Sequence, residues 1–185
     1  MKIISGIYRG RKINTFKDKN LRPTTTQTRE AIFNILTHHE ELPDLNNSDI
    51  TFLEVFGGSA IMSFEAISRG LKKAIVIDRN PRSKKLCEEN SHFLNDEEIK
   101  FFVFDIEKLP KAPDQADLCF IDPPYRLNLE EISLNSLHKG NWLNNDATVI
   151  LETDKRNQFE IPEQYNILFE KLYGKTRLIF LKYSN

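Results

Sequence analysis

Hydrophobic residues recur along this chain in short runs, separated by segments with the spacing of amphipathic helices. Runs rich in β-branched and aromatic residues predict five buried strands, at residues 50–56, 74–77, 99–104, 116–121 and 147–151. The segments between them predict helices, at residues 59–70, 81–94 and 129–139. Alternating strands and helices indicate a parallel, doubly wound sheet of the α/β, Rossmann-like class.

The C-terminal region has a different pattern. Residues 167–173 and 177–183 read as two strands joined by Gly174-Lys175-Thr176, which predicts a terminal antiparallel hairpin. Together with the five earlier strands, this hairpin predicts a seven-stranded, mostly parallel sheet.

The N-terminal region precedes this alternation. Residues 2–13 alternate loosely, as in a small hairpin or an extended arm. Thr24-Thr25-Thr26-Gln27 predicts a capping box with Thr24 as the N-cap. The helix that follows is expected to bury four apolar residues, Ala31, Ile32, Ile35 and Leu36. We therefore expect an N-terminal extension over residues 1–46 and a main domain over residues 47–185.

Charge is unevenly distributed, although the net charge is only −1. Residues 1–30 contain eight Lys or Arg against two acids, a net charge of +6, so the remaining 155 residues carry −7. A solvated loop would explain part of this asymmetry, but a basic segment joined to an acidic body predicts contact with nucleic acid. The two cysteines, Cys87 and Cys119, have no metal-ligand spacing, and no apolar run is long enough to cross a membrane. We expect a cytoplasmic monomer without a metal.

Acidic residues follow four of the predicted parallel strands, and a fifth acid lies near the end of the first strand. They are Asp78, Asp105, Asp122, Glu152 and Glu54. In an open α/β sheet, ligands bind outside the carboxyl ends of the strands. Acids at this edge suit a polyhydroxylated, cationic ligand.

Asp122-Pro123-Pro124-Tyr125 is the segment with the clearest chemistry. Two prolines restrict the backbone, so that the Asp122 carboxylate and the Pro123 carbonyl can accept both hydrogens of an exocyclic amine. Tyr125 offers a flat surface on which a base can stack. A turn after a strand would also use Asp and Pro. The motif resembles that of methyltransferases that alkylate nitrogens conjugated to a ring or carbonyl.

The segment from Glu54 to Ala60 resembles the first motif of class I S-adenosylmethionine-dependent methyltransferases, with Ala60 where glycine is common. Under that resemblance Asp78 accepts hydrogen bonds from the ribose and Glu54 reaches the methionine amino group. Asp105 either lies near the adenine amine or caps the next helical turn. The expected cofactor-binding residues are Glu54, Phe56, Gly57, Gly58, Ser59, Asp78 and Asp105.

Three further segments in the N-terminal third of the chain carry a more specific likeness. They are residues 3–12, Leu21-Arg22-Pro23-Thr24-Thr25 and Arg29-Glu30-Ala31-Ile32-Phe33-Asn34. In this order, they closely resemble the RsmD family of bacterial 16S ribosomal RNA guanine-N2 methyltransferases. The resemblance implies methyl transfer to one guanine amine of the small ribosomal subunit, or of an assembly intermediate. It implies catalytic residues at positions 122–125 and an RNA-binding set of Arg9, Arg11, Lys12, Arg22 and Thr24.

Other functions remain open from the residues alone. A DNA amino-methyltransferase shares the Asp-Pro-Pro-Tyr segment, but it normally needs a separate target-recognition region. A protein-glutamine methyltransferase would favour Asn at position 122. A non-enzymatic RNA-binding module would explain the basic segment but not the acids at the strand ends.

Overall fold

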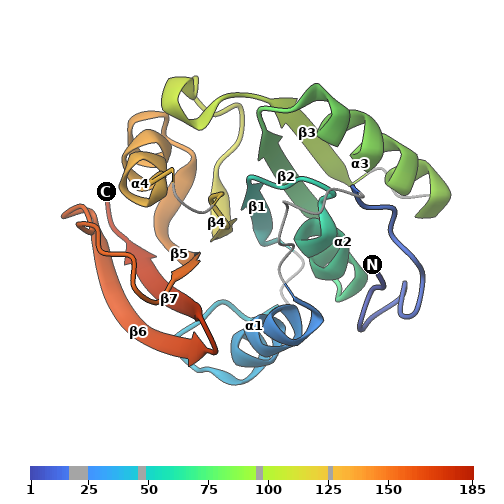
Figure 1. Cartoon of the computed structure of the whole chain (residues 1–185), viewed down its shortest axis with the longest axis horizontal. Helices are drawn as coiled ribbons and strands as arrows, with labels where there is room; N and C mark the ends of the chain where they lie inside the picture. Colours follow the sequence, from blue (N-terminus) through green and yellow to red (C-terminus); the bar gives the residue numbers. More distant parts are fainter. Residues whose placement is uncertain (17–24, 46–48, 95–97, 125–126) are drawn as a thin grey trace.

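A computed structural model describes residues 1–16, 25–45, 49–94, 98–124 and 127–185. Its seven strands form one sheet in the order β3-β2-β1-β4-β5-β7-β6 (Figure 1). The strands are β1 (Thr51–Val55), β2 (Lys73–Asp78), β3 (Ile99–Val103), β4 (Ala116–Ile121), β5 (Leu143–Asp154), β6 (Tyr165–Tyr173) and β7 (Thr176–Tyr183). The helices are α1 (Thr26–His38), α2 (Ile61–Ser68), α3 (Pro81–Leu94), the short η1 (Ile106–Lys108) and α4 (Glu130–Lys139).

Strand pairing confirms the predicted sheet. The first five strands pair with one another in parallel: β1 with β2 and β4, β2 with β3, and β4 with β5. β7 pairs antiparallel with both β5 and β6. The chain moves outward from β1 to β3 and then returns, so that β4 lies beside β1. Ligands bind at such a reversal of strand order, outside the carboxyl ends of the strands.

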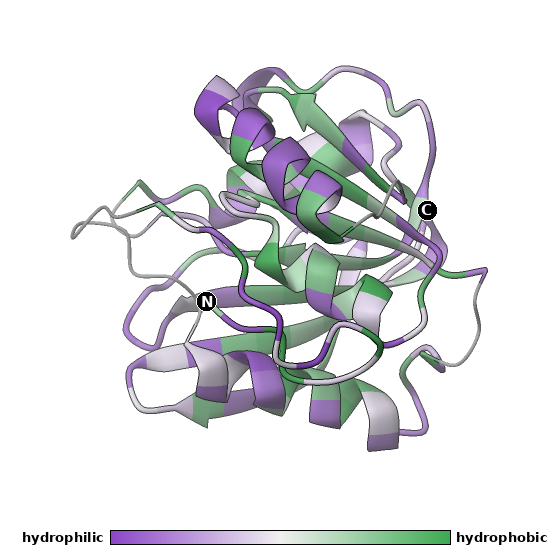
Figure 2. Ribbon diagram, turned by 90° about the vertical axis from the view of Figure 1, so that its right-hand side faces the viewer, coloured by the Kyte–Doolittle hydropathy of each residue, from purple (hydrophilic) through white to green (hydrophobic). Residues whose placement is uncertain are grey.

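Helices cover both faces of the sheet. Leu134 and Leu137 of α4 and Ile106 of η1 belong to the core on one face, with Trp142. Residues of α1, α2 and α3 pack on the opposite face, in two apolar clusters. The strands are largely hydrophobic and the exposed helix surfaces hydrophilic (Figure 2). No helix among the described residues is long and apolar enough to span a bilayer.

α1 differs from the prediction at its N-cap. The cap is Thr25, whose hydroxyl accepts a hydrogen bond from the amide of Thr28, and Thr24 lies outside the described residues. A run of three threonines leaves the cap position ambiguous in the sequence.

The buried face of α1 is also turned relative to the expectation. It contains Arg29, Ile32, Phe33 and Leu36, while Ala31 and Ile35 are only partly buried. This rotation of the buried face follows from the pairing of Arg29 with Glu65 of α2. A pattern of apolar residues cannot indicate such a pairing.

β5 begins four residues before the predicted start at Ala147. The extra residues include Asn144, Asn145 and Asp146, which have poor strand propensity. The register with β4 shifts between Ala116 and Leu118, and Asn144 donates a hydrogen bond to Asp117 of β4 (2.7 Å). A side-chain contact therefore extends the strand beyond what its composition predicts.

Residues 1–16 pack against the main domain. Ile3 and Ile13 are buried with residues of α2 and α3, and Lys2 and Lys12 form an antiparallel bridge. The division between residues 46 and 47 stays a prediction, because residues 46–48 lie outside the described residues.

Candidate active site

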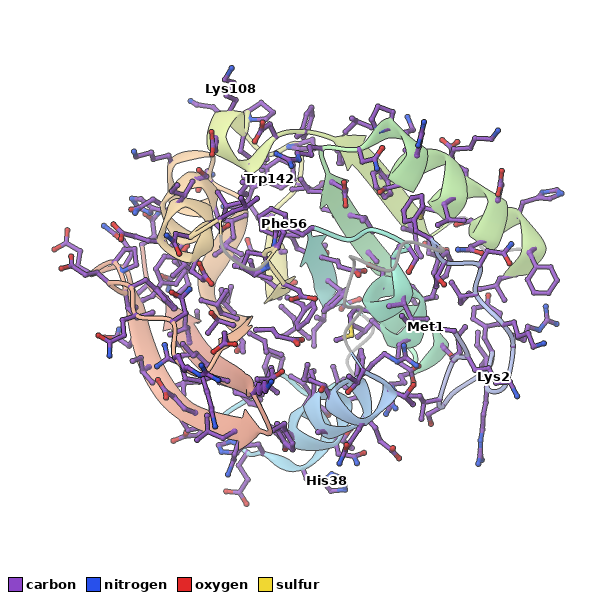
Figure 3. The ribbon with its side chains drawn as sticks, in the orientation of Figure 1. Met1, Lys2, His38, Phe56, Lys108 and Trp142 are labelled. Atoms are coloured by element: carbon purple, nitrogen blue, oxygen red, sulfur yellow. The ribbon has the colours of Figure 1, made fainter. Side chains whose placement is uncertain are left out.

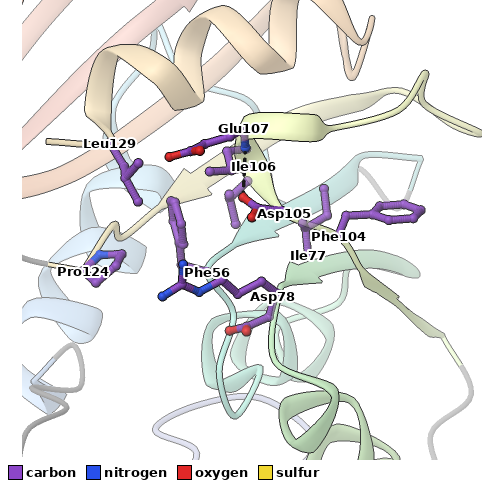
Figure 4. Close-up of a pocket in the computed structure, with 11 residues that line it drawn as sticks. Phe56, Ile77, Asp78, Phe104, Asp105, Ile106, Glu107, Pro124 and Leu129 are labelled. Carbon is purple, nitrogen blue, oxygen red and sulfur yellow. Dashed lines mark hydrogen bonds between the residues drawn. The ribbon is translucent and has the colours of Figure 1, made fainter. Parts of the chain in front are cut away.

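A pocket lies at the carboxyl ends of β1, β2 and β4, where the strand order reverses (Figure 4). Its empty volume is about 360 Å³, a figure that includes space open to solvent. Of the residues predicted from the sequence, Phe56, Asp78, Asp105 and Pro124 line it. Its other lining residues are Val55, Ile77, Arg79, Phe104, Ile106, Glu107 and Leu129.

The turn after β1 forms one wall of this site. Phe56, Gly58 and Ala60 all have left-handed backbone angles, with φ of 61°, 53° and 59°. Residues other than glycine rarely adopt left-handed backbone angles. Phe56 and Ala60 therefore have strained conformations of the kind found at functional sites. A Cβ on Gly57 would overlap Val76, which explains why glycine is required there.

Asp78 fixes the turn from the neighbouring strand. Its Oδ2 accepts a hydrogen bond from the amide of Gly58 (2.9 Å), and its Oδ1 accepts one from the amide of Asn80 (2.8 Å). The carboxylate is half-buried and lines the pocket. Asp78 therefore orders the turn and also places a carboxylate in the wall of the pocket.

For Asp105 the sequence left two roles open, capping of the next helical turn and a place at the cofactor site. Asp105 caps η1, because its carboxylate accepts a hydrogen bond from the amide of Glu107 (3.1 Å). It also lines the pocket. The aromatic and aliphatic neighbours of Asp105, Phe104 and Ile106, were not predicted as site residues. Their only signal in the sequence was their position on either side of a strand-end acid.

Glu54 lies buried beneath the turn, with 3% of its surface exposed. Its Oε2 accepts hydrogen bonds from both the amide and the hydroxyl of Ser63, at 2.8 and 2.6 Å. Burial raises the pKa of Glu54 to about 7, the Ser63 hydrogen bonds oppose this rise, and the nearby charge of Asp122 adds to it. A proton on Glu54 is therefore coupled to the charge of Asp122.

The segment after β4 begins at the predicted position. Asp122 is partly exposed, Pro123 is buried and Pro124 lines the pocket; Tyr125 lies outside the described residues. Glu130, at the start of α4, accepts hydrogen bonds from Thr153 (2.7 Å) and Asn157 (2.6 Å). These hydrogen bonds, which the sequence did not indicate, connect the start of α4 to the end of β5 and the residues after it.

Arg9, Arg11 and Lys12, the predicted RNA-binding residues that the structure describes, do not line the pocket. The loop that carries Arg9, Arg11 and Lys12 docks on Ser68, the last residue of α2, whereas the pocket lies where α2 begins. Arg22 and Thr24 lie outside the described residues.

Comparison with known proteins gives one consistent result. The family described as "Conserved hypothetical protein 95" matches residues 1–182. "Ribosomal RNA small subunit methyltransferase D" of Haemophilus influenzae is 31% identical, over 94% of this chain and 89% of that protein. The protein of the same name from Escherichia coli K12 is 29% identical, over 95% and 86% of the two chains.

A solved structure agrees with these relatives. The structure of yhhF from Escherichia coli superposes with a TM-score of 0.82 at 26% identity, over 100% of this chain and 98% of that one. The seven-stranded sheet, the strained turn after β1 and the Asp-Pro-Pro segment after β4 fit a class I methyltransferase fold. The chain therefore belongs to the RsmD family.

Proposed function

We propose that this protein transfers a methyl group from S-adenosylmethionine to the exocyclic N2 amine of a guanine in 16S ribosomal RNA, within the small ribosomal subunit or an assembly intermediate. The observation that carries the proposal is the position of the Asp122-Pro123-Pro124 segment, which directly follows β4 and lines the pocket through Pro124. The names of the Haemophilus and Escherichia relatives support an rRNA substrate. The proposal includes a monomer that acts in the cytoplasm.

The pocket fits the proposed cofactor. Phe56, Ile106 and Leu129 offer apolar walls for an adenine ring, while Asp78 and Asp105 offer carboxylates for hydroxyl and amine groups. Glu54, Gly57, Gly58 and Ser59 form the rest of the turn that we expect to hold the methionine part. When bound, the cofactor supplies an electrophilic methyl group.

Asp122 and Pro123 are proposed to orient the acceptor. The lone pair of a guanine amine is delocalised into the ring, so the nitrogen is a poor nucleophile. Hydrogen bonds from its two N–H groups to the Asp122 carboxylate and the Pro123 carbonyl would fix its direction and stabilise the positive charge that develops on it. Tyr125 would stack on the guanine base once that base has left the stack of RNA bases.

The basic segment is proposed to hold the RNA. Arg9, Arg11, Lys12, Arg22 and Thr24 would contact phosphates, which position the substrate without reading its sequence. The extension over residues 1–46 is the part of the chain to which we assign this task.

Transfer of tritium from labelled S-adenosylmethionine tests the proposal. The acceptors are small-subunit particles that lack the modification and, beside them, naked 16S RNA. We expect label in particle RNA from the natural protein and a large loss with Asp122→Asn, while the exposed control Asp146→Asn stays active. Label in DNA or protein instead would point to one of the other methyltransferase classes. Absence of cofactor binding would favour a non-enzymatic RNA-binding module.

A further inference from the structure

The N-terminal loop carries a concentration of free positive charge. Residues 1–16 contain Lys2, Arg9, Arg11 and Lys12 and no acidic residue. All four cationic side chains are exposed, and none of them takes part in the ion pairs found among the described residues. We call residues 2–12 the cationic loop.

Hydrogen bonds to α2 hold the backbone of the cationic loop in place. The amides of Ile4 and Ser5 donate to the buried carboxylate of Glu65, at 2.8 and 3.0 Å. The amide of Ile7 donates to the carbonyl of Ser68 (2.8 Å), and the amide of Tyr8 donates to the hydroxyl of Ser68 (2.9 Å). An ordered loop loses little conformational entropy when it binds a partner.

Gly6 shows how closely the loop is fitted. Its φ is +82°, and a Cβ at this position would overlap the carbonyl of Ser68. This close fit, together with the hydrogen bonds to α2, holds the backbone from which the charged side chains project.

An exposed aromatic ring lies beside these charges. Phe93, near the end of α3, has 58% of its surface exposed, and the guanidinium carbon of Arg11 lies 6.0 Å from the centre of its ring. An exposed aromatic ring beside a guanidinium is the combination on which unpaired nucleobases stack.

The tip of the cationic loop lies at the C-terminal end of α2, whereas the pocket lies beyond the N-terminal end of that helix. α2 begins beside the pocket and ends at Ser68, and its eight residues span about 12 Å. α3 likewise begins just after Asp78 and ends near Phe93. Lys2 and Phe56 are well separated in Figure 3, in agreement with this path. The tip of the loop at Ser68 and the pocket are therefore separated by about the length of α2.

We propose that the cationic loop and Phe93 form a second RNA-docking site, which binds the phosphates of a folded RNA element away from the target guanine and stacks an unpaired base on Phe93. This inference rests on the proposed function, because it assumes that the partner is RNA. The substrate must then present RNA both to the pocket and to the cationic loop. Such a substrate is a large folded RNA or particle and not an isolated short stem-loop.

Salt dependence of binding tests the charge contribution. Fluorescence anisotropy with a labelled 16S RNA transcript compares the natural protein with the triple variant Arg9→Ala/Arg11→Ala/Lys12→Ala. If three phosphate contacts are lost, the affinity advantage of the natural protein shrinks about 20- to 40-fold between 50 and 200 mM salt. The triple variant Lys111→Ala/Lys139→Ala/Lys171→Ala removes three exposed charges elsewhere and should not change the salt dependence. Equal behaviour of the two triple variants would overturn the proposal, and unchanged cofactor affinity shows that both are folded.

Cross-linking tests the position of the docked RNA. A benzophenone amino acid replaces Phe93 or, as the control, the exposed Leu172 of β6, and reverse transcription maps the cross-linked nucleotides. We expect specific cross-links from position 93, at nucleotides outside the helix or loop that carries the methylated guanine. Cross-links only beside that guanine, or none from position 93 while the natural protein methylates RNA, would refute a second site. No methylation by the natural protein, with cross-links still present, would instead refute the proposed reaction.

Discussion

Protonation of the buried Glu54 makes the stability of this protein depend on pH. The pKa of Glu54 rises from an ordinary value of 4.5 to about 7, because burial disfavours its charged form. The folded protein therefore holds the proton more tightly than the unfolded chain does. It follows that Glu54 lowers the free energy of unfolding progressively as the pH rises from 4.5 through 7.

The magnitude follows from the same two values. A change of pKa from 4.5 to about 7 corresponds to about 3 kcal/mol of destabilisation, which is complete only above pH 7. Glu54→Gln keeps an oxygen that can accept the hydrogen bonds of Ser63 but carries no charge. We expect the variant to equal the natural protein in stability near pH 4.5 and to exceed it by about 3 kcal/mol at pH 8.

Urea unfolding at a series of pH values measures this difference. Glu160→Gln, which changes an exposed glutamate in the same way, should shift the free energy of unfolding little at any pH. The reasoning would be refuted if the stability difference between Glu54→Gln and the natural protein were the same at pH 5 and pH 8.

Three further predictions concern the site and the loop. Gly6→Ala should lower the free energy of unfolding by more than about 2 kcal/mol, whereas Gly10→Ala, with the same φ and open space, should lose only about 1 kcal/mol; equal losses in thermal or urea unfolding would contradict the fit against Ser68. Glu65→Gln leaves the charge of buried Arg29 without its acid and should destabilise the protein by about 3–5 kcal/mol in urea unfolding, and a loss below about 1 kcal/mol would contradict this role. Asp78→Asn removes a charged acceptor from the pocket and should weaken S-adenosylmethionine binding by about 1.5–3 kcal/mol in calorimetry; unchanged affinity would remove Asp78 from the cofactor site.

The sheet and the pocket at the carboxyl ends of its strands could be predicted because their signals are local. The apolar run before Asp122 gives β4 its bounds, and Pro81 and Leu94 are the first and last residues of α3, as expected. Parallel strands share one carboxyl edge, so acids that follow them must gather there. That rule brings Asp78 and Asp105 to one pocket without knowledge of the coordinates.

Features that depend on contacts between distant segments could not be predicted. Arg29 faces inward because of Glu65, 36 positions later in the chain. Phe56 and Ala60 have left-handed backbone angles although neither is glycine, so their conformation has no sequence signal. The position of the cationic loop at the C-terminal end of α2 depends on the path of that helix and on the contacts of Ser68. The sequence predicted its charge but not its separation from the pocket.

Identification of the methylated nucleoside tests the central claim most directly. Small-subunit particles lacking the modification are incubated with the protein and S-adenosylmethionine, and the RNA is digested to nucleosides for mass spectrometry. The account predicts N2-methylguanosine at one position, absent with Asp122→Asn. Methylation of adenine, of cytosine or of a guanine ring atom would contradict the proposed roles of Asp122 and Pro123.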